Sequence, residues 1–124
     1  MIVGIGTDIV EVPRIKQSIE KYGDRFLNRI FTQTEIEYCD QYGDGRYLHY
    51  AARFAAKEAF SKAIGTGITK GFKFREVGIR NHKTGRPEVE LEGGLQQKWG
   101  GYSIVVSLSH TDNNAIAFLT LEKY

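Results

Sequence analysis

The sequence predicts an α+β fold in which an antiparallel sheet packs on one long helix, with short helices near the N-terminus. Two observations about its pattern support this prediction. Helix-like patterns dominate residues 13–64, and strand-like alternation dominates residues 74–122. Helices that mostly precede strands favour an α+β fold over a doubly wound parallel sheet. The length of 124 residues suits one domain, so residues 1–124 are expected to form a single domain.

The chain is predicted to begin with a strand and a short helix. Residues 2–10 are largely apolar and β-branched with interspersed glycines, which indicates a strand that presents Asp8 near its end. Pro13 suits the first turn of a helix that reaches about Tyr22, and Gly23 can end that helix.

Two more short helices are expected before the long one. Asp24 can cap the first of them. Thr32 and Glu35 have the spacing of a capping box, which predicts a helix from there to about Gln41. The glycine-rich stretch 43–45 is expected to be a loop.

The longest predicted helix covers residues 47–64. This stretch is rich in Ala, Lys, Glu and Arg and contains no Gly or Pro, and Gly65 is a good C-terminal cap. Its apolar residues recur at spacings of three and four, as one buried helix face requires. They are Tyr47, Leu48, Ala51, Ala55, Ala59 and Ala63.

The second half of the chain is predicted to consist mainly of strands. Residues 74–80 and 87–91 alternate on either side of a turn at 81–85, which is typical of a hairpin. A helical turn is expected at residues 94–99. Two further strands, joined by a polar turn, are expected at residues 102–109 and 115–122.

Composition and charge argue against several classes of protein. The chain has 17 basic and 15 acidic residues, a net charge of +2, which argues against a dedicated nucleic-acid module and leaves room for a local basic patch. No apolar stretch approaches the ~20 residues that span a membrane, and the N-terminus lacks a signal-peptide pattern. The lone Cys39 cannot form a disulfide within the chain and suits a reducing compartment. We therefore expect a cytoplasmic protein without a nucleic-acid or membrane partner.

The long helix carries an unusual polar side. Glu58 and Lys62 are four residues apart and can face each other, and Arg53 and Lys57 form a second row beside them. On spacing alone, a solvated helix face is the simpler interpretation. Glu–Lys pairs at this spacing are common and contribute only ~0.2–0.5 kcal/mol.

Three neighbouring features favour a site for Mg²⁺ and a diphosphate over a solvated face. The turn 65–67 could bring backbone amides close to a phosphate, and Arg53, Lys57 and Lys62 add positive charge near it. Asp8 can supply a second carboxylate, although a capping or turn role explains an isolated Asp equally well. Mg²⁺ usually binds one or two protein carboxylates and completes its shell with waters and phosphates. The spacing does not identify the reaction.

His110 stands at the end of a predicted strand, close to Ser107 and Ser109. This position suits phosphate contacts, although a lone His is more often a structural residue. His49 and His82 have no such neighbours and are interpreted as structural or exposed.

Three segments resemble the motifs of the holo-acyl-carrier-protein synthases, the small class of 4′-phosphopantetheinyl transferases. They are residues 4–11 (GIGTDIVE), 53–63 (RFAAKEAFSKA) and 107–111 (SLSHT), with a smaller match at 85–87 (GRP). The second segment is long and specific, and all of them occur in the family's order across nearly the whole chain. The resemblance implies a 4′-phosphopantetheinyl transferase-like fold. The chain departs from the family at Asn113-Asn114, where an aromatic residue is common.

The resemblance also implies a reaction and the residues that carry it. The phosphopantetheine arm of coenzyme A would pass to a serine of apo-acyl carrier protein, and 3′,5′-ADP would leave. Asp8 and Glu58 match ligands of Mg²⁺, Lys62 matches a lysine that contacts the phosphates, and Glu58 would deprotonate the serine, directly or through a water molecule. Positions that line the coenzyme A pocket are matched by Arg53 and the turn Gly65-Thr66-Gly67, and those around its nucleotide end by Pro87 and His110.

The resemblance further implies an acidic carrier protein as partner and a homotrimer with active sites between subunits. A basic stripe in the first helical region would dock this partner electrostatically. Arg14 is the first choice within it, because it lies closest to the Asp8 segment. Gly23 interrupts the stripe and acidic neighbours dilute it, so a plain solvated face stays open for each residue. The residues of the stripe are Arg14, Lys21, Arg25 and Arg29.

Two other functions are compatible with parts of the pattern. A non-catalytic binder of coenzyme A or of an acidic carrier protein would keep the basic positions and have no need of Asp8 and Glu58. A small Mg²⁺-dependent phosphohydrolase would use the carboxylates, but such enzymes usually carry more clustered aspartates. A nucleic-acid module is the weakest alternative, because Phe and Tyr are not interleaved with a basic run.

Overall fold

The computed structural model describes residues 1–69 and 71–123 and has the predicted α+β fold. The strands are β1 (Ile2–Glu11), β2 (Val77–Asn81), β3 (Pro87–Leu91), β4 (Ser103–His110) and β5 (Asn114–Glu122). The α-helices are α1 (Val12–Tyr22), α2 (Asp24–Ile30), α3 (Gln33–Asp40), α4 (Arg46–Ala63) and α5 (Gly93–Trp99), and 3-10 helices occur at η1 (Gly43–Gly45) and η2 (Phe74–Glu76). In this part of the chain no helix has both the length and the apolar composition needed to cross a membrane.

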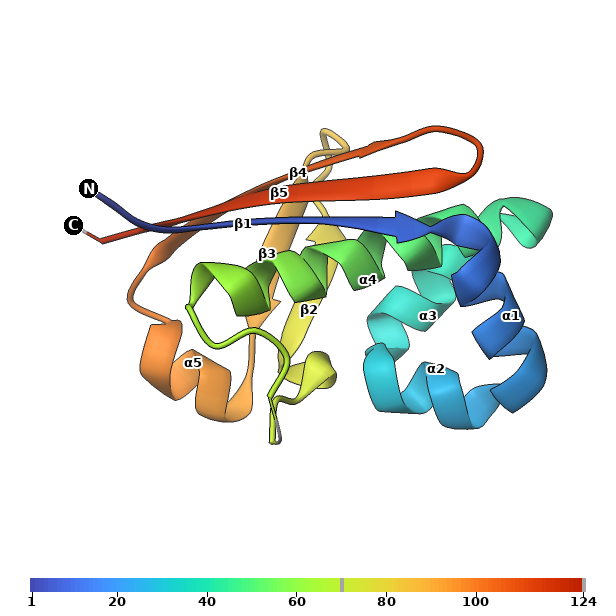
Figure 1. The fold of residues 1–124 in the computed structure, drawn as a ribbon, viewed down its shortest axis with the longest axis horizontal. Helices are drawn as coiled ribbons and strands as arrows, with labels where there is room; N and C mark the ends of the chain where they lie inside the picture. Colours follow the sequence, from blue (N-terminus) through green and yellow to red (C-terminus); the bar gives the residue numbers. More distant parts are fainter. Residues whose placement is uncertain (70, 124) are drawn as a thin grey trace.

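The larger sheet is antiparallel and has the strand order β1-β5-β4, and β2 and β3 form a separate antiparallel hairpin. The register of the larger sheet pairs Asp8 of β1 with Ala117 of β5, and Ser107 of β4 with Phe118 of β5. Figure 1 shows this sheet lying along α4, with α1, α2 and α3 gathered towards one end of the helix and α5 towards the other. The predicted packing of an antiparallel sheet on one long helix is therefore confirmed.

The hairpin begins later than the sequence predicts. Residues Phe74–Glu76 form the 3-10 helix η2, and the strand begins at Val77. The carbonyl oxygen of Phe74 accepts a hydrogen bond from Lys57 Nζ at 3.0 Å. Alternation alone could not reveal this contact, because Lys57 is 17 residues away in the chain.

Two glycines let β1 lie unusually close to α4. A Cβ atom at Gly4 would overlap the carbonyl oxygen of Ala63, and one at Gly6 would overlap that of Ala59. Only glycine fits at both positions, because the obstacle is helix backbone that cannot move aside. The close approach brings Asp8, two residues after Gly6, against the polar side of α4.

The predicted buried face of α4 is confirmed. Ala55 and Ala59 are completely buried and pack under the larger sheet in one cluster with Leu119 and Leu121 of β5. The small alanine side chains of α4 let the helix backbone approach the sheet. The two glycines of β1 have the same effect from the sheet side of this contact.

Lys57 has a different role from the one that its spacing suggests. Its side chain is completely buried, and Nζ donates to Glu35 Oε1 at 2.8 Å. It also donates to the carbonyl oxygens of Phe74 at 3.0 Å and Val77 at 2.7 Å, so all three ammonium hydrogens have partners. Lys57 and Lys62 point to different sides of α4, because five residues correspond to a rotation of about 140°. The interpretation of Lys57 as part of a phosphate site is therefore wrong.

Glu35 completes this buried ion pair and caps α3. The predicted capping box forms, since Thr32 Oγ1 accepts the N–H of Glu35 and Glu35 Oε1 accepts the N–H of Thr32. Glu35 Oε2 accepts the N–H of Ile79 at 2.9 Å. The Glu35–Lys57 pair thus ties α3, α4 and β2 together, with the hydrogen bonds that a buried pair of charges requires.

Candidate functional site

Asp8, Glu58 and Lys62 meet where β1 crosses the polar side of α4. Glu58 and Lys62 lie about one helical turn apart on α4. Lys62 Nζ donates to Asp8 Oδ1 at 3.1 Å and to the carbonyl oxygen of Thr7 at 3.0 Å. The structure therefore brings together the two predicted carboxylates and the predicted lysine from segments that are 54 residues apart in the chain.

The Asp8 carboxyl and burial both influence the ionisation of Glu58. Partial burial raises the pKa of Glu58 to about 7, with the neighbouring Asp8 carboxyl as the next cause, and the Lys62 ammonium opposes the rise. Two carboxylates that share a site are expected to have this effect. The raised pKa means that Glu58 holds its proton more tightly than an ordinary glutamate does.

The donor set fits a small divalent cation. The side chain of Asp8 is only 11% exposed, and its Oδ2 atom is buried without a hydrogen-bond partner among residues 1–69 and 71–123. A cation held by this oxygen and by Glu58 would satisfy the atom and relieve the repulsion. Within the same residues there is no cluster of three or more His, Cys, Asp or Glu side chains. The remaining ligands would be waters or substrate oxygens, which is typical of Mg²⁺ sites.

The glycine-rich turn after α4 uses its amides to end the helix. The Gly65 N–H donates to the carbonyl oxygen of Lys62 at 3.0 Å, and the Gly67 N–H donates to that of Ser61 at 2.9 Å. Both glycines have a positive φ, 86° and 62°, which side-chain-bearing residues rarely adopt. These two amides are therefore not free to bind a phosphate, contrary to the interpretation of the sequence. Thr66, between them, is exposed at the same end of α4 as Lys62.

Arg53 points to a different side of α4 from Glu58. Its side chain lies between α3 and the hairpin and is only 2% exposed. The guanidinium carbon is 4.1 Å from the centroid of the Tyr38 ring, and Nη2 donates to Asn81 Oδ1. The structure therefore does not bring Arg53 to the carboxylate pair.

Pro87 lies close to the hydrogen-bond partner of Arg53, and His110 lies near His49. Pro87 begins β3 directly opposite Asn81, the hydrogen-bond partner of Arg53. His110 ends β4 and is exposed. The pKa of His49 is lowered by burial, and also by the positive charges of Arg53 and His110 near it. The candidate residues thus form two groups, one around Asp8 and one around Arg53.

A cavity of about 450 Å³ joins Glu58 to Arg14. Its size lies within the range of small-molecule sites. The sequence alone did not predict this cavity. The one feature of the sequence that pointed to it is the departure from the family at Asn114, which lines it. The residues that line it include Arg14, Ser18, Phe26, Phe54, Glu58 and Asn114.

A second hollow, of about 490 Å³, continues from this cavity between α1 and α2. It shares Ser18 and Phe26 with the first, so the two form one continuous surface. Lys21 does not line it and instead lies over the Tyr22 ring, with Nζ 5.3 Å from the ring centroid. Of the predicted basic stripe, the structure therefore places Arg14, Arg25 and Arg29 along this surface. The residues that line the second hollow are Ser18, Tyr22, Arg25, Phe26 and Arg29.

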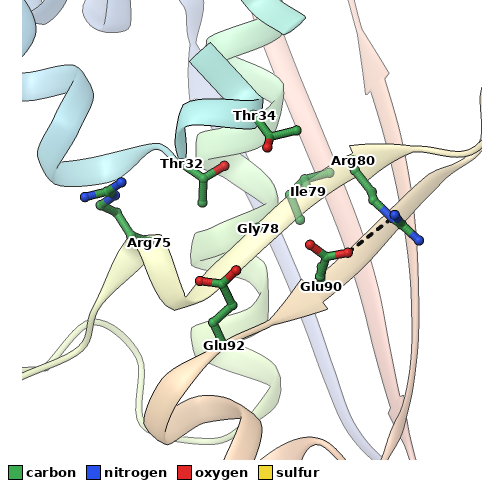
Figure 2. A pocket seen from close by; sticks show the side chains of 8 residues that line it. All are labelled: Thr32, Thr34, Arg75, Gly78, Ile79, Arg80, Glu90 and Glu92. Carbon is green, nitrogen blue, oxygen red and sulfur yellow. Dashed lines mark ion pairs between the residues drawn. The ribbon is translucent and has the colours of Figure 1, made fainter. Parts of the chain in front are cut away.

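A crevice between α3 and the hairpin, shown in Figure 2, is not a candidate site. Its volume is about 50 Å³, enough for one or two water molecules. The ion pair between Arg80 and Glu90, with Nε and Oε2 3.4 Å apart, lies along its wall. It shares no lining residue with the cavity that contains Glu58.

The face of the larger sheet that points away from α4 is apolar and exposed. Its largest side chains alternate along the strands, so they project from one face. The register pairs Ile9 directly with Ile116. Exposed apolar surfaces of this kind mark interaction sites. The side chains, which are 40–62% exposed, are Ile5, Ile9, Val105, Ile116 and Phe118.

The family model described as 4′-phosphopantetheinyl transferase superfamily matches residues 4–118, which contain both groups of candidate residues, and the chain belongs to this superfamily. Among its relatives, the chain is similar to the holo-[acyl-carrier-protein] synthase of Ruminiclostridium cellulolyticum, with 48% identity over 120 residues, 94% of this chain and 90% of that protein. The resemblance found in the motifs is therefore confirmed.

Solved structures give the same result. The holo-[acyl-carrier-protein] synthase of Neisseria meningitidis matches with a TM-score of 0.86 and 42% identity, over 99% of this chain and 100% of that chain. The holo-(acyl-carrier-protein) synthase of Bacillus anthracis, in complex with CoA (3′,5′-ADP), matches with a TM-score of 0.84 and 37% identity, over 100% of this chain and 99% of that chain. The similarity thus extends over the whole fold.

Proposed function

We propose that this chain transfers the 4′-phosphopantetheine group of coenzyme A to a serine of apo-acyl carrier protein and releases 3′,5′-ADP. The observation that carries the proposal is the meeting of Asp8, Glu58 and Lys62, in which a buried carboxylate oxygen without a partner in the described chain lies beside a second carboxyl group. Relatives that bear the synthase name, and one solved with CoA, support it. The reaction would take place in the cytoplasm, where the lone Cys39 stays reduced.

Asp8 and Glu58 would hold the Mg²⁺ ion that the family implies. When bound, Mg²⁺ neutralises charge on a diphosphate and makes its phosphorus easier to attack. The buried Asp8 Oδ2 atom and the raised pKa of Glu58 are the features of this chain that suit such an ion.

Side chains of this protein would act on both the attacking serine and the leaving 3′,5′-ADP. The serine oxygen forms a bond to the phosphorus that carries the pantetheine arm, and the bond from this phosphorus to the bridging oxygen of 3′,5′-ADP breaks. Lys62, held by Asp8 and the Thr7 carbonyl, would stabilise the negative charge that develops on the phosphates. Glu58 would accept the serine proton, directly or through a water molecule.

We also propose that the chain forms a homotrimer with active sites between subunits. The residues matched to coenzyme A include two groups on different sides of α4, Lys62 with the turn 65–67 and Arg53 with Pro87. A site between neighbouring subunits would combine one group from each. The exposed apolar face of the larger sheet would provide the interface, because association would remove it from water. Light scattering is expected to give the mass of a trimer, and a monomeric protein would contradict the proposal.

The surface that runs from Glu58 past Arg14 to Arg25 and Arg29 would receive the acidic carrier protein. Basic side chains along it would attract the partner and hold its serine towards the carboxylate site. Lys21, which lies above the Tyr22 ring, would add long-range attraction without lining the surface.

Mass spectrometry of an apo-acyl carrier protein tests the proposed reaction. Incubation with this protein, coenzyme A and Mg²⁺ should add the mass of one phosphopantetheine, and EDTA should abolish the gain until excess Mg²⁺ is restored. No gain with several folded carrier proteins, together with intact coenzyme A binding, would favour the non-catalytic binder. A gain that resists EDTA would contradict the role assigned to Mg²⁺.

A further inference from the structure

We infer that Asn81 is a positioning residue that links the buried guanidinium of Arg53 to the turn before Pro87, and thereby shapes the nucleotide end of the coenzyme A pocket. This inference rests on the proposed function, which assigns Arg53 and Pro87 to that pocket.

The guanidinium of Arg53 is buried within the chain. Only 2% of the residue is exposed, and its guanidinium lies against the Tyr38 ring. Its Nε atom is buried and has no hydrogen-bond partner in the described part of the chain, whereas Nη2 donates to Asn81 Oδ1. A buried charge with few partners depends strongly on each of them. Asn81 is therefore a principal anchor of this guanidinium.

Asn81 makes two hydrogen bonds in different directions. Its Oδ1 accepts from Arg53, and its Nδ2 donates to the carbonyl oxygen of Gly85 at 3.0 Å. A side-chain amide can accept and donate at the same time, which neither a carboxylate nor an alkyl group can do. The backbone of the turn is closed separately, by bonds from His82 N–H to Arg86 and from Gly85 N–H to His82, both of 2.8 Å. Asn81 thus connects an already formed turn to α4.

The position of the turn at residues 82–86 determines where Pro87 lies. The hairpin register pairs Asn81 directly with Pro87, and a proline cannot donate a backbone hydrogen bond to its neighbour. This end of the hairpin therefore depends on the hydrogen bonds of the turn. Pro87 lines a hollow of about 290 Å³ together with residues 103–106 of β4. Movement of the turn would displace one wall of that hollow.

Three variants separate the two hydrogen bonds. Asn81→Ala removes both, whereas Asn81→Asp keeps an acceptor for Arg53 and places a carboxylate oxygen against the Gly85 carbonyl. Thr84→Ala is the matched control, because Thr84 is an exposed residue of the same turn whose hydroxyl lies 3.3 Å from His82 Nδ1. Coenzyme A binding is measured by calorimetry, transfer by the KM for each substrate and by kcat, and folding by thermal unfolding.

Both Asn81 variants should bind coenzyme A about tenfold more weakly, because both lose the hydrogen bond to the Gly85 carbonyl that holds the turn. The KM for coenzyme A should rise equally, while kcat and the KM for the carrier protein change less than about twofold. Asn81→Asp should keep the wild-type Tm, because the buried Arg53 keeps its partner. Thr84→Ala should behave as the wild type in every measurement.

Wild-type affinity for coenzyme A in Asn81→Asp would overturn the inference, and so would an equal rise in the KM for the carrier protein, which indicates a general loss of structure. Failure of the wild-type protein itself to bind coenzyme A would contradict the proposed function instead, and is detected before any variant is compared.

Discussion

Lys57 and Glu58 are neighbours on α4, yet they belong to two regions with opposite properties. On one side, Lys57 pairs with Glu35 at 2.8 Å, and both side chains are closed to solvent. On the other side, Glu58 faces Asp8, which has a buried oxygen without a partner among the described residues, and the side chain of Lys62 is 51% exposed. Lysine and carboxylate side chains thus form a stabilising ion pair on one side of the helix. On the other side they form a group whose negative charge is suited to binding a cation.

The difference lies in whether the charges are satisfied. In a buried ion pair with every hydrogen bond made, removal of one partner leaves an uncompensated charge, which strongly destabilises the fold. Two neighbouring carboxylates with too few partners repel each other, and only a proton or a cation relieves this. Substitutions in the first region should therefore reduce stability, and those in the second should reduce activity.

The largest expected effect is the loss of activity in Asp8→Ala or Glu58→Ala. Either variant removes one of the two proposed protein ligands of Mg²⁺, so the rate of transfer should fall at least about 1,000-fold. The Tm should stay the same or rise, because the repulsion between the carboxyl groups disappears. The rate is measured by mass spectrometry of the carrier protein, with Glu122→Ala at the far end of the sheet as control. Full activity in either variant would contradict the assignment of Asp8 and Glu58 to the active site.

Lys57→Met should produce the next largest effect, on stability. The substitution leaves the charge of Glu35 buried without its counterion, so the free energy of unfolding should fall by about 3–5 kcal/mol. Urea denaturation measures it, and Lys83→Met, at an exposed turn position, is the control. The double variant with Glu35→Gln, which removes the buried charge and keeps an acceptor for backbone N–H groups, should recover part of the loss. If the Lys57→Met variant is stable but binds coenzyme A more weakly, Lys57 contributes to phosphate binding and the structural role given to it is wrong.

A smaller effect is expected in Arg14→Glu, at the edge of the second region. Reversal of this charge should weaken the binding of an acidic carrier protein about tenfold, while coenzyme A binding changes less than about twofold. Lys16→Glu is a suitable control, because Lys16 lies on the same helix but over the Tyr47 ring. Equal weakening of both substrates would show that Arg14 does not act in carrier-protein docking.

The smallest expected effect is a pH-dependent change in the stability of the metal-free protein. The pKa of Glu58 is raised from 4.5 to about 7, so the folded state holds the proton more tightly than the unfolded state. The stability that this group contributes is fully present below about pH 4.5 and lost as the pH rises through about 7. The Tm of the wild type, relative to that of Glu58→Gln, should therefore fall by a few degrees across this range.

The same pair of proteins tests the cation. At pH 8, excess MgCl₂ should raise the Tm of the wild type, because a ligand that binds only the folded state stabilises it, and should leave that of Glu58→Gln nearly unchanged. A Tm difference that does not vary with pH would show that the pKa of Glu58 is not raised in the folded protein.

Sequence by itself determined the local elements and the family. The 3.6-residue periodicity of residues 47–64 predicts α4 and its buried alanines, because periodicity records which face of a helix leaves water. The capping box of Thr32 and Glu35 formed as predicted, since both partners lie within one turn. The motif around Glu58 placed the chain among the 4′-phosphopantetheinyl transferases, and the family model confirms this.

Only the tertiary structure decided which charge has which partner. Lys57 and Glu35 are 22 residues apart, and Lys62 and Asp8 are 54 apart, so neither pairing follows from local spacing. For the same reason Arg53, expected to line a pocket, is buried against Tyr38. A helical pattern shows the direction in which a side chain leaves its helix, whereas the groups that satisfy its charge come from other elements that meet it only in the packed fold.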